Sequence, residues 1–224
     1  MIQLRRFRWK RRRAALALLP AGLMLFMAHV AGASVPSPAA QTGPTASANA
    51  VTALTLDAPR NVRLGHVAVL RGNVTPEGPR DIAIEIGGDT ANARSGADGA
   101  FTARWKPSHA GEYVAHAGLG GDTGAGPSDT AKVNVYRPAS ASYYGPGLYG
   151  GALACGGTLS PGKVGVANKT LPCGTHLTLR YRHRTARVQV IDRGPYSGNR
   201  EFDLTAATRA KLGFPSTGTV LSTR

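Results

Sequence analysis

Short runs of alternating apolar and polar residues, separated by turn residues, are the feature that most limits what this chain can fold into. Six such runs lie between Val51 and Arg137, at 53–56, 67–70, 81–86, 101–105, 113–116 and 131–135. Alternation with period two is typical of half-buried strands, and strands at this spacing are typical of a β-sandwich. The 29 Gly and 15 Pro among 224 residues favour many turns over helical bundles. We therefore expect an all-β protein.

The N-terminal segment has the composition of a targeting signal. Seven Arg and Lys residues precede residue 14, an apolar run follows from Ala14, and Ala31-Gly32-Ala33 comes before Ser34. This order predicts a secretory signal peptide in residues 1–33. The apolar run of roughly 20 residues is also long enough to span a bilayer, so an uncleaved membrane anchor is the alternative.

In both cases the remainder of the chain is predicted to be extracytoplasmic, either secreted or associated with the cell envelope. Membrane contact is expected only through the N-terminal segment, if that segment remains uncleaved. Residues 34–50 carry no charge and are rich in Ser, Pro, Ala and Thr, which predicts a disordered linker.

The positive charge is distributed unevenly over the rest of the chain. Residues 34–138 hold nine basic and nine acidic residues, whereas residues 139–224 hold 11 basic and three acidic ones. A nucleic-acid partner is not expected, because an exported chain meets none. The runs 176–182 and 185–191 predict a hairpin with an Arg-rich face, formed by Arg180, Arg182, Arg184 and Arg187. Such a face would attract anionic wall polymers.

Cys155 and Cys173 are the two cysteines of the chain. An oxidising compartment favours a disulfide between them, and closing this loop would contribute roughly 3 kcal/mol to stability. The alternative is a catalytic cysteine with His176 or His183 as its base. Two cysteines make no zinc site, and no metal or organic cofactor is indicated.

Four motifs follow one another in the C-terminal third. They are Ala141-Ser-Tyr-Tyr-Gly145, Lys169-Thr-Leu-Pro-Cys-Gly-Thr175, Asp192-Arg-Gly-Pro-Tyr196 and Phe202-Asp-Leu-Thr205. Together they resemble the motifs of the rare lipoprotein A (RlpA-like) double-psi β-barrel family, which is related to expansins. The resemblance covers nearly all of 139–224 and implies a six-stranded barrel. Residues 51–137, with the turn at 96–99, resemble a bacterial immunoglobulin-like β-sandwich.

The resemblance also implies a function, namely binding of peptidoglycan glycan strands and their cleavage by a lytic transglycosylase that leaves 1,6-anhydromuramyl ends. One carboxyl group can serve as acid and then as base in this reaction. Asp192 matches the functional aspartate of the family, and Asp203 matches the aspartate that expansins require. Candidate glycan-binding residues are Tyr143, Tyr144, Asn168, Arg193 and Tyr196.

Simpler structural roles are open for the same residues. Asp192 could pair with a nearby arginine at a turn. Asp203 could cap a short helix predicted over 205–212. The tyrosines could close the core of the barrel.

The sequence departs from the family at two positions. Members with lytic activity carry a Glu and, eleven residues on, a His, where this chain has Gly157 and Asn168. An asparagine can hydrogen-bond a sugar hydroxyl but cannot carry a proton. Two hypotheses follow: a lytic transglycosylase that uses one aspartate, or a non-catalytic, expansin-like module that binds polysaccharide or loosens the wall.

Overall fold

In a computed structural model of the chain, residues 50–120 and 126–224 are described. The predicted signal or anchor segment and nearly all of the predicted linker lie outside the described residues. The described part is all-β with one short helix, as expected. No helix within it has the length and apolar character needed to cross a membrane.

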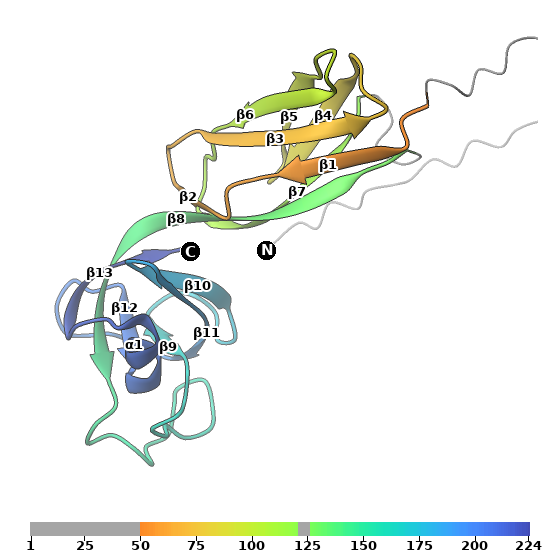
Figure 1. Cartoon of the computed structure of the whole chain (residues 1–224). Helices are drawn as coiled ribbons and strands as arrows, with labels where there is room; N and C mark the ends of the chain where they lie inside the picture. The colour runs from red at the N-terminus through yellow and green to blue at the C-terminus, as the bar shows by residue number, and fades with distance from the viewer. Residues whose placement is uncertain (1–49, 121–125) are drawn as a thin grey trace, which may run out of the picture. The chain divides into compact units, whose positions relative to one another are not determined.

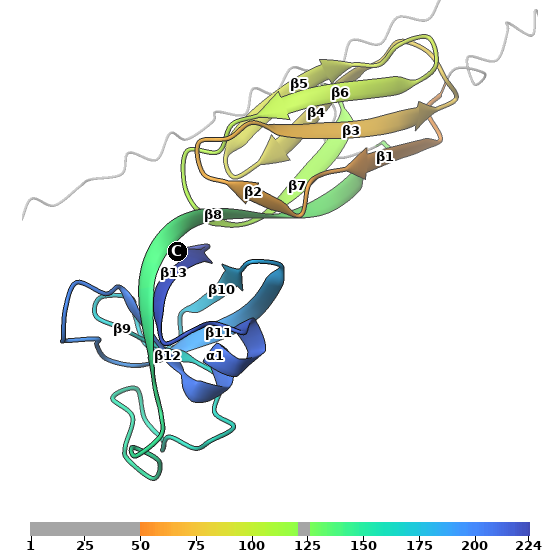
Figure 2. The ribbon, with the colours of Figure 1, turned by 60° about the vertical axis from the view of Figure 1, so that its left-hand side comes forward.

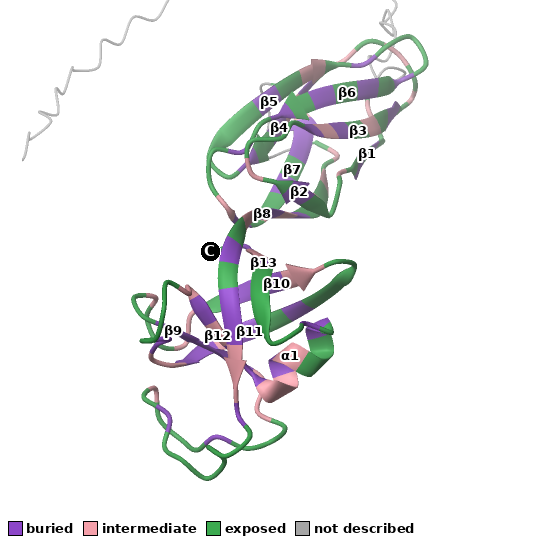
Figure 3. Cartoon of the chain, turned by 90° about the vertical axis from the view of Figure 1, so that its left-hand side faces the viewer, coloured by how far each residue is buried: buried purple, intermediate pink, exposed green. Residues whose placement is uncertain are grey.

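The first part of the described chain forms two sheets around one hydrophobic core. One sheet is antiparallel and consists of β1 (Ala53–Asp57), β3 (Ala68–Thr75) and β6 (Ala100–Trp105). The other contains β2 (Asn61–Arg63), β4 (Asp81–Ile86), β5 (Asp89–Arg94), β7 (Gly111–Leu119) and the first half of β8 (Asp129–Tyr144). Buried and exposed residues alternate along β6 (Figure 3), and Leu70, Ile84 and Val133 are fully buried between the sheets.

All six alternating runs form strands, so the predicted sandwich strands are confirmed. Strands β2 and β5 were not predicted, because neither carries a run of alternating large apolar residues. The immunoglobulin-like identity of this part stays a prediction.

Strand β8 continues from the first core into the second (Figure 1). Its first half pairs with β7, and its second half pairs with β13 (Thr217–Ser222). The boundary predicted at 137–139 therefore falls inside an uninterrupted strand of 16 residues.

The C-terminal part is a closed barrel of six strands (Figure 2). Besides β8 and β13 it contains β9 (Val166–Asn168), β10 (His176–Tyr181), β11 (Arg184–Asp192) and β12 (Phe202–Thr205). Around the barrel the order is β8, β13, β10, β11, β9 and β12, and parallel pairing of β12 with β8 closes the ring. The predicted hairpin is confirmed as β10 and β11, and the barrel core includes Phe202, Leu204 and Val190.

The helix α1 (Ala206–Leu212) follows β12 directly. Its N-cap is Thr205, whose Oγ1 accepts a hydrogen bond from the Thr208 backbone N–H at 3.2 Å. Gly213 ends the helix in the left-handed conformation (φ 61°), which glycine adopts without a steric penalty. The expectation that Asp203 caps this helix is wrong, because Asp203 lies on β12, two residues before the N-cap.

Truncation of a barrel core residue should destabilise the fold. Leu204 is fully buried, and Leu204→Ala should lower the free energy of unfolding by about 2–5 kcal/mol through lost burial and the cavity left behind. Leu148→Ala is the matched control, because Leu148 is 57% exposed. Urea denaturation followed by near-UV circular dichroism measures both variants. Equal losses for the two would contradict the assigned core.

Candidate functional site

Two aspartates lie on one face of the barrel sheet with a single alanine between them. Asp192 on β11 and Asp203 on β12 are both register partners of Ala167 on β9. Side chains of register partners point to the same face of a sheet. Adjacent strands are about 4.8 Å apart, which places the two aspartate Cα atoms roughly 10 Å from each other. Because alanine carries only a methyl group, no larger side chain of β9 separates the two carboxyl groups.

A bulge in β11 brings Asp192 to this face. Val190 pairs with Val166, yet the next residue of β9, Ala167, pairs with Asp192 rather than with Ile191. The extra residue in β11 shifts the alternation by one position, as bulges do where they re-aim a side chain. Asp192 therefore joins the row of Asp203, and the hydrophobic Ile191 packs in a separate small cluster.

Backbone groups hold the Asp192 carboxylate in place. Its Oδ1 accepts hydrogen bonds from the backbone N–H groups of Ala154 and Arg193, both at 2.9 Å. The alternative in which Asp192 pairs with an arginine is not what the structure shows, because no ion pair to it occurs within the described residues. The Arg193 guanidinium instead donates to the Asn168 carbonyl at 3.1 Å and lies 3.0 Å from Cys173 Sγ.

Asp203 occupies a less solvated position. The Ser142 hydroxyl donates to its Oδ1 at 2.7 Å, from the register partner on β8. Burial raises the pKa of Asp203 above its ordinary value, and the charge of Asp192 raises it further. The Ser142 hydrogen bond and the Arg200 charge act in the opposite direction without cancelling this increase in the pKa. The two aspartates are thus electrostatically coupled, and Asp203 retains its proton to a higher pH than a free aspartate.

The three candidate tyrosines have different surroundings. Tyr144 packs against the small cluster of Leu153, Leu159 and Ile191. Its buried hydroxyl has no well-aligned hydrogen-bond partner within the described residues. Asp192 nevertheless lies near enough for its charge to change the pKa of this hydroxyl. Burial, and then the Asp192 charge, raise the pKa of Tyr144, so its phenol stays neutral beside the carboxylates.

The other two tyrosines differ in exposure. Tyr143 packs against the barrel core, with the Arg209 guanidinium 4.4 Å from its ring centroid. Tyr196 is 79% exposed and is the last residue of the Asp192 motif. Of these two, Tyr196 alone presents an open ring surface on which a sugar can stack.

The Asn168 side chain hydrogen-bonds to the backbone of its own domain and is not part of an open surface. Its side chain is buried, with Nδ2 donating to the Glu201 carbonyl at 3.1 Å. Its Oδ1 accepts from the backbone N–H groups of Thr170 and Leu171, at 3.0 and 2.8 Å. Asn168 is only 4% exposed, so its amide offers little surface for the sugar hydrogen bond expected of it. Gly157, the other departure from the family, lies in an exposed turn with φ 78°, where a side chain would be strained.

The predicted disulfide between Cys155 and Cys173 is present. The alternative of a catalytic thiol is therefore wrong. Cys155 directly follows Ala154, which donates to Asp192, and Cys173 lies against the guanidinium of Arg193. The disulfide thus joins the segment of Ala154, whose N–H bonds the Asp192 carboxylate, to the segment of Cys173, which contacts the side chain of Arg193.

Sequence reasoning missed several residues of the site. Ser142 and Arg200 both act on Asp203, and Ala154 acts on Asp192 through its backbone. Ser142 lies within a recognised motif, but its role depends on the pairing of β8 with β12. The third carboxylate of the barrel, Glu201, forms an ion pair with Arg137, which leaves Asp192 and Asp203 as the carboxylates without an arginine partner.

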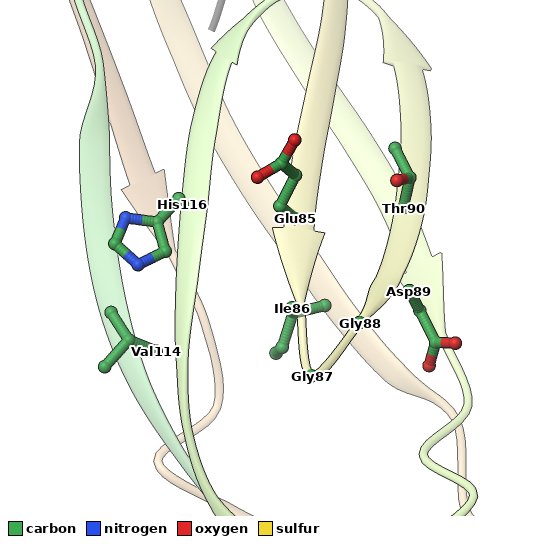
Figure 4. Close-up of a pocket in the computed structure, with 8 residues that line it drawn as sticks. All are labelled: Glu85, Ile86, Gly87, Gly88, Asp89, Thr90, Val114 and His116. Carbon is green, nitrogen blue, oxygen red and sulfur yellow. The ribbon is translucent and has the colours of Figure 1, made fainter. Parts of the chain in front are cut away.

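A hollow of about 400 Å³ lies elsewhere, on the outer face of the sheet that contains β4 and β7 (Figure 4). Glu85 and His116, register partners on these strands, point outward at its centre. No group of three His, Cys, Asp or Glu residues that could hold a metal ion occurs within the described ranges. The hollow therefore has no metal-ligand set.

Comparisons with known proteins agree with the barrel architecture. A family model described as "Lytic transglycolase" matches residues 137–221. The probable endolytic peptidoglycan transglycosylase RlpA of Synechocystis sp. is 33% identical over 99 residues, which cover 39% of this chain and 31% of that protein. The endolytic peptidoglycan transglycosylase RlpA of Campylobacter jejuni is 37% identical over 81 residues, covering 35% and 30%.

Among solved structures, the Streptomyces papain inhibitor is 20% identical and covers 39% of this chain and 90% of its own, with a TM-score of 0.31. The chain spans about a third of the length of the curated relatives it matches. The matched segment coincides with the closed six-stranded barrel and contains all four motifs. The C-terminal part of this chain, residues 137–221, is an RlpA-like double-psi β-barrel.

Proposed function

We propose that the protein acts outside the cytoplasm, where its barrel binds peptidoglycan glycan strands at the face of Asp192 and Asp203 and cleaves them as a lytic transglycosylase. The observation that carries this proposal is the placement of two carboxyl groups on one face, coupled to each other and, within the described residues, in no ion pair with an arginine. The names of the relatives, endolytic peptidoglycan transglycosylases, support the same reaction.

The reaction needs one proton delivered and one proton removed. The bond between the muramyl C1 and the leaving O4 breaks as O4 gains a proton, and the C6 hydroxyl of the same muramyl unit attacks C1 and loses its proton. One aspartate could perform both transfers. In this structure the two groups have different surroundings, which is typical of an acid and base pair. Asp203, with its raised pKa, delivers the proton to O4, and Asp192 accepts the proton of the C6 hydroxyl.

The second candidate function is a non-catalytic, expansin-like module that binds polysaccharide or loosens the wall. The observation that favours it is the structure at the two departures from the family. Gly157 lies in a turn that disfavours any side chain, and the Asn168 amide is committed to the fold. Glycan contact would then rest on Asp203 and the exposed Tyr196 ring.

Removal of either aspartate should abolish product formation. Peptide-free peptidoglycan strands incubated with the protein should accumulate 1,6-anhydromuramyl ends, measured by mass spectrometry. Asp192→Asn and Asp203→Asn should each lower the rate at least 100-fold, since acid or base groups contribute about 10²–10⁴ in rate. Asp57→Asn, on an exposed position of β1, is the matched control and should leave the rate unchanged.

The outcomes separate the two functions. If Asp192→Asn abolishes formation of the 1,6-anhydromuramyl ends but Asp203→Asn does not, the division of roles between the two aspartates is wrong. Asp192 alone would then act as both acid and base. If no ends appear with the parent while the strands still bind it in a pull-down, the second candidate function replaces the first.

The raised pKa of Asp203 can be tested without substrate. Because the folded barrel holds this proton more tightly than the unfolded chain does, the stabilisation is complete below the ordinary pKa of 3.8 and is lost as pH rises through the folded pKa. Asp203→Asn keeps an acceptor for Ser142 and does not titrate. Relative to the parent, the variant should therefore become more stable as pH rises from about 3.8, in urea denaturation at a series of pH values. A difference in stability that is independent of pH would contradict the raised pKa.

The disulfide should matter for both stability and the position of Asp192. The double variant Cys155→Ser and Cys173→Ser should lose roughly 3 kcal/mol of unfolding free energy by the loop-entropy estimate. The loop that carries Ala154 should also become less restrained, so the carboxyl ¹³C signal of Asp192 should move while that of Asp57 stays. An unmoved Asp192 signal in the folded double variant would show that the disulfide does not position this carboxylate.

A further inference from the structure

The tip of the β10–β11 hairpin and the end of α1 bring exposed positive charges together. Arg182 lies in the turn of the hairpin, Arg184 begins β11 directly after that turn, and Lys211 lies in the last turn of the helix. All three side chains are exposed. We refer to Arg182, Arg184 and Lys211 as the hairpin–helix patch.

Two contacts join these segments of the barrel. The Arg184 guanidinium lies over Gly213, the C-cap of α1. A Cβ atom built on this glycine would be 3.2 Å from Arg184 Nη1. The rings of Tyr181 and Phe214 meet edge to face, with centroids 5.1 Å apart. The two elements also lie side by side in Figures 1 and 2. The patch is therefore one surface, although its residues are nearly 30 positions apart in the chain.

The protein does not neutralise this patch. The ion pairs of the described residues involve Arg94, Arg137 and Arg187, and none involves a patch residue. The three acidic residues of 139–224 are engaged elsewhere, at Asp192, Glu201 and Asp203. Like charges gathered without a counter-charge disfavour the folded state unless a ligand compensates them.

Local structure accounts for only part of the charge. Positive residues near a helix C-terminus interact favourably with the helix dipole, which explains Lys211 and in part Arg184. Arg209, in the same turn, has a role in the fold, since it covers the Tyr143 ring and its Nε donates to the Pro215 carbonyl at 3.2 Å. The helix dipole does not account for Arg182, which lies at the outer end of the hairpin. Its guanidinium makes a cation–π contact with Tyr181, 5.5 Å from the ring centroid, but its charge is in no ion pair within the described residues.

The chemistry of the patch favours phosphate groups on a soluble polymer over a membrane surface. Arginine forks match phosphate oxygens in bidentate hydrogen bonds. Membrane-surface sites combine basic residues with apolar side chains that insert into the lipid. The large apolar side chains exposed in the described ranges lie outside the patch, at Val67, Val114, Leu148, Tyr149 and Tyr196.

We propose that the hairpin–helix patch binds a linear polymer with repeated phosphodiester groups, as a site separate from the aspartate face. Binding of such a polymer would hold the barrel at a phosphate-bearing surface independently of any glycan in the aspartate site. This proposal does not depend on the proposed function, because no patch residue contacts Asp192 or Asp203.

The test is a titration of fluorescein-labelled poly(glycerol phosphate), followed by anisotropy. It uses the full chain with its seven basic residues before residue 14 replaced by Gln, so that they add no binding. In this background, Arg182→Gln, Arg184→Gln and Lys211→Gln together should weaken binding roughly 100-fold, at about fivefold for each charge. The affinity of the parent should also fall as salt is added.

The matched control removes the same number of charges from exposed positions on the other core: Arg63→Gln, Arg71→Gln and Arg104→Gln. It should change the affinity by less than about threefold, because these charges lie outside the patch. Asp192→Asn should bind the polymer as the parent does.

Equal weakening by the two triple variants would overturn the proposal in favour of a net-charge effect. Vesicles of phosphatidylglycerol, or a single-stranded DNA, bound more tightly than the polymer would overturn the assigned class of partner. If the parent protein does not bind poly(glycerol phosphate) at physiological salt, the patch is not a binding site for this class of polymer.

Discussion

The parallel pairing of β12 with β8 is the constraint on which the rest of the barrel depends. It closes the ring of six strands, and the same register sets Asp203 opposite Ser142. Because β12 also pairs with β9, it places Asp203 beside Ala167, where the bulge in β11 delivers Asp192 from the other side. Closure of the ring and the placement of Asp203 thus both depend on β12, and the pairing of β11 with β9 adds Asp192.

The electrostatics of the barrel give each acidic group a different surrounding within a strongly basic structure. Glu201 is neutralised by Arg137, Asp192 is held by two backbone N–H groups, and Asp203 is partly desolvated beside it. The neutral phenol of Tyr144 adds a buried hydroxyl next to this pair. The position where the family carries a glutamate is here Gly157 in an open turn, so this position supplies no acid or base group.

Much of the fold could be predicted from local sequence, because alternation and turn residues are local signals. The six sandwich runs, the basic hairpin and the short helix all correspond to elements of the structure, although β8 continues nine residues beyond its predicted run, and the ordered motifs predicted the barrel. The bulge at Ile191 could not be predicted, since it depends on pairing with a distant strand. The same reason explains why Asp203 was expected to cap a helix, because its partner Ser142 comes from the distant strand β8. Asn168 was expected to face a ligand, but its amide oxygen bonds the backbone two and three residues on, a local turn pattern that the prediction did not take into account.

The measurement that tests the central claim most directly is carboxyl ¹³C NMR of the aspartate-labelled protein, titrated with peptide-free peptidoglycan oligosaccharides. The Asn variants assign the signals of Asp192 and Asp203. The account predicts that both signals move together as the glycan binds, while those of Asp57 and Asp98 on the other core stay unchanged. Binding that leaves Asp192 and Asp203 unmoved would show that the glycan contacts another surface, and the aspartate face would no longer be the site.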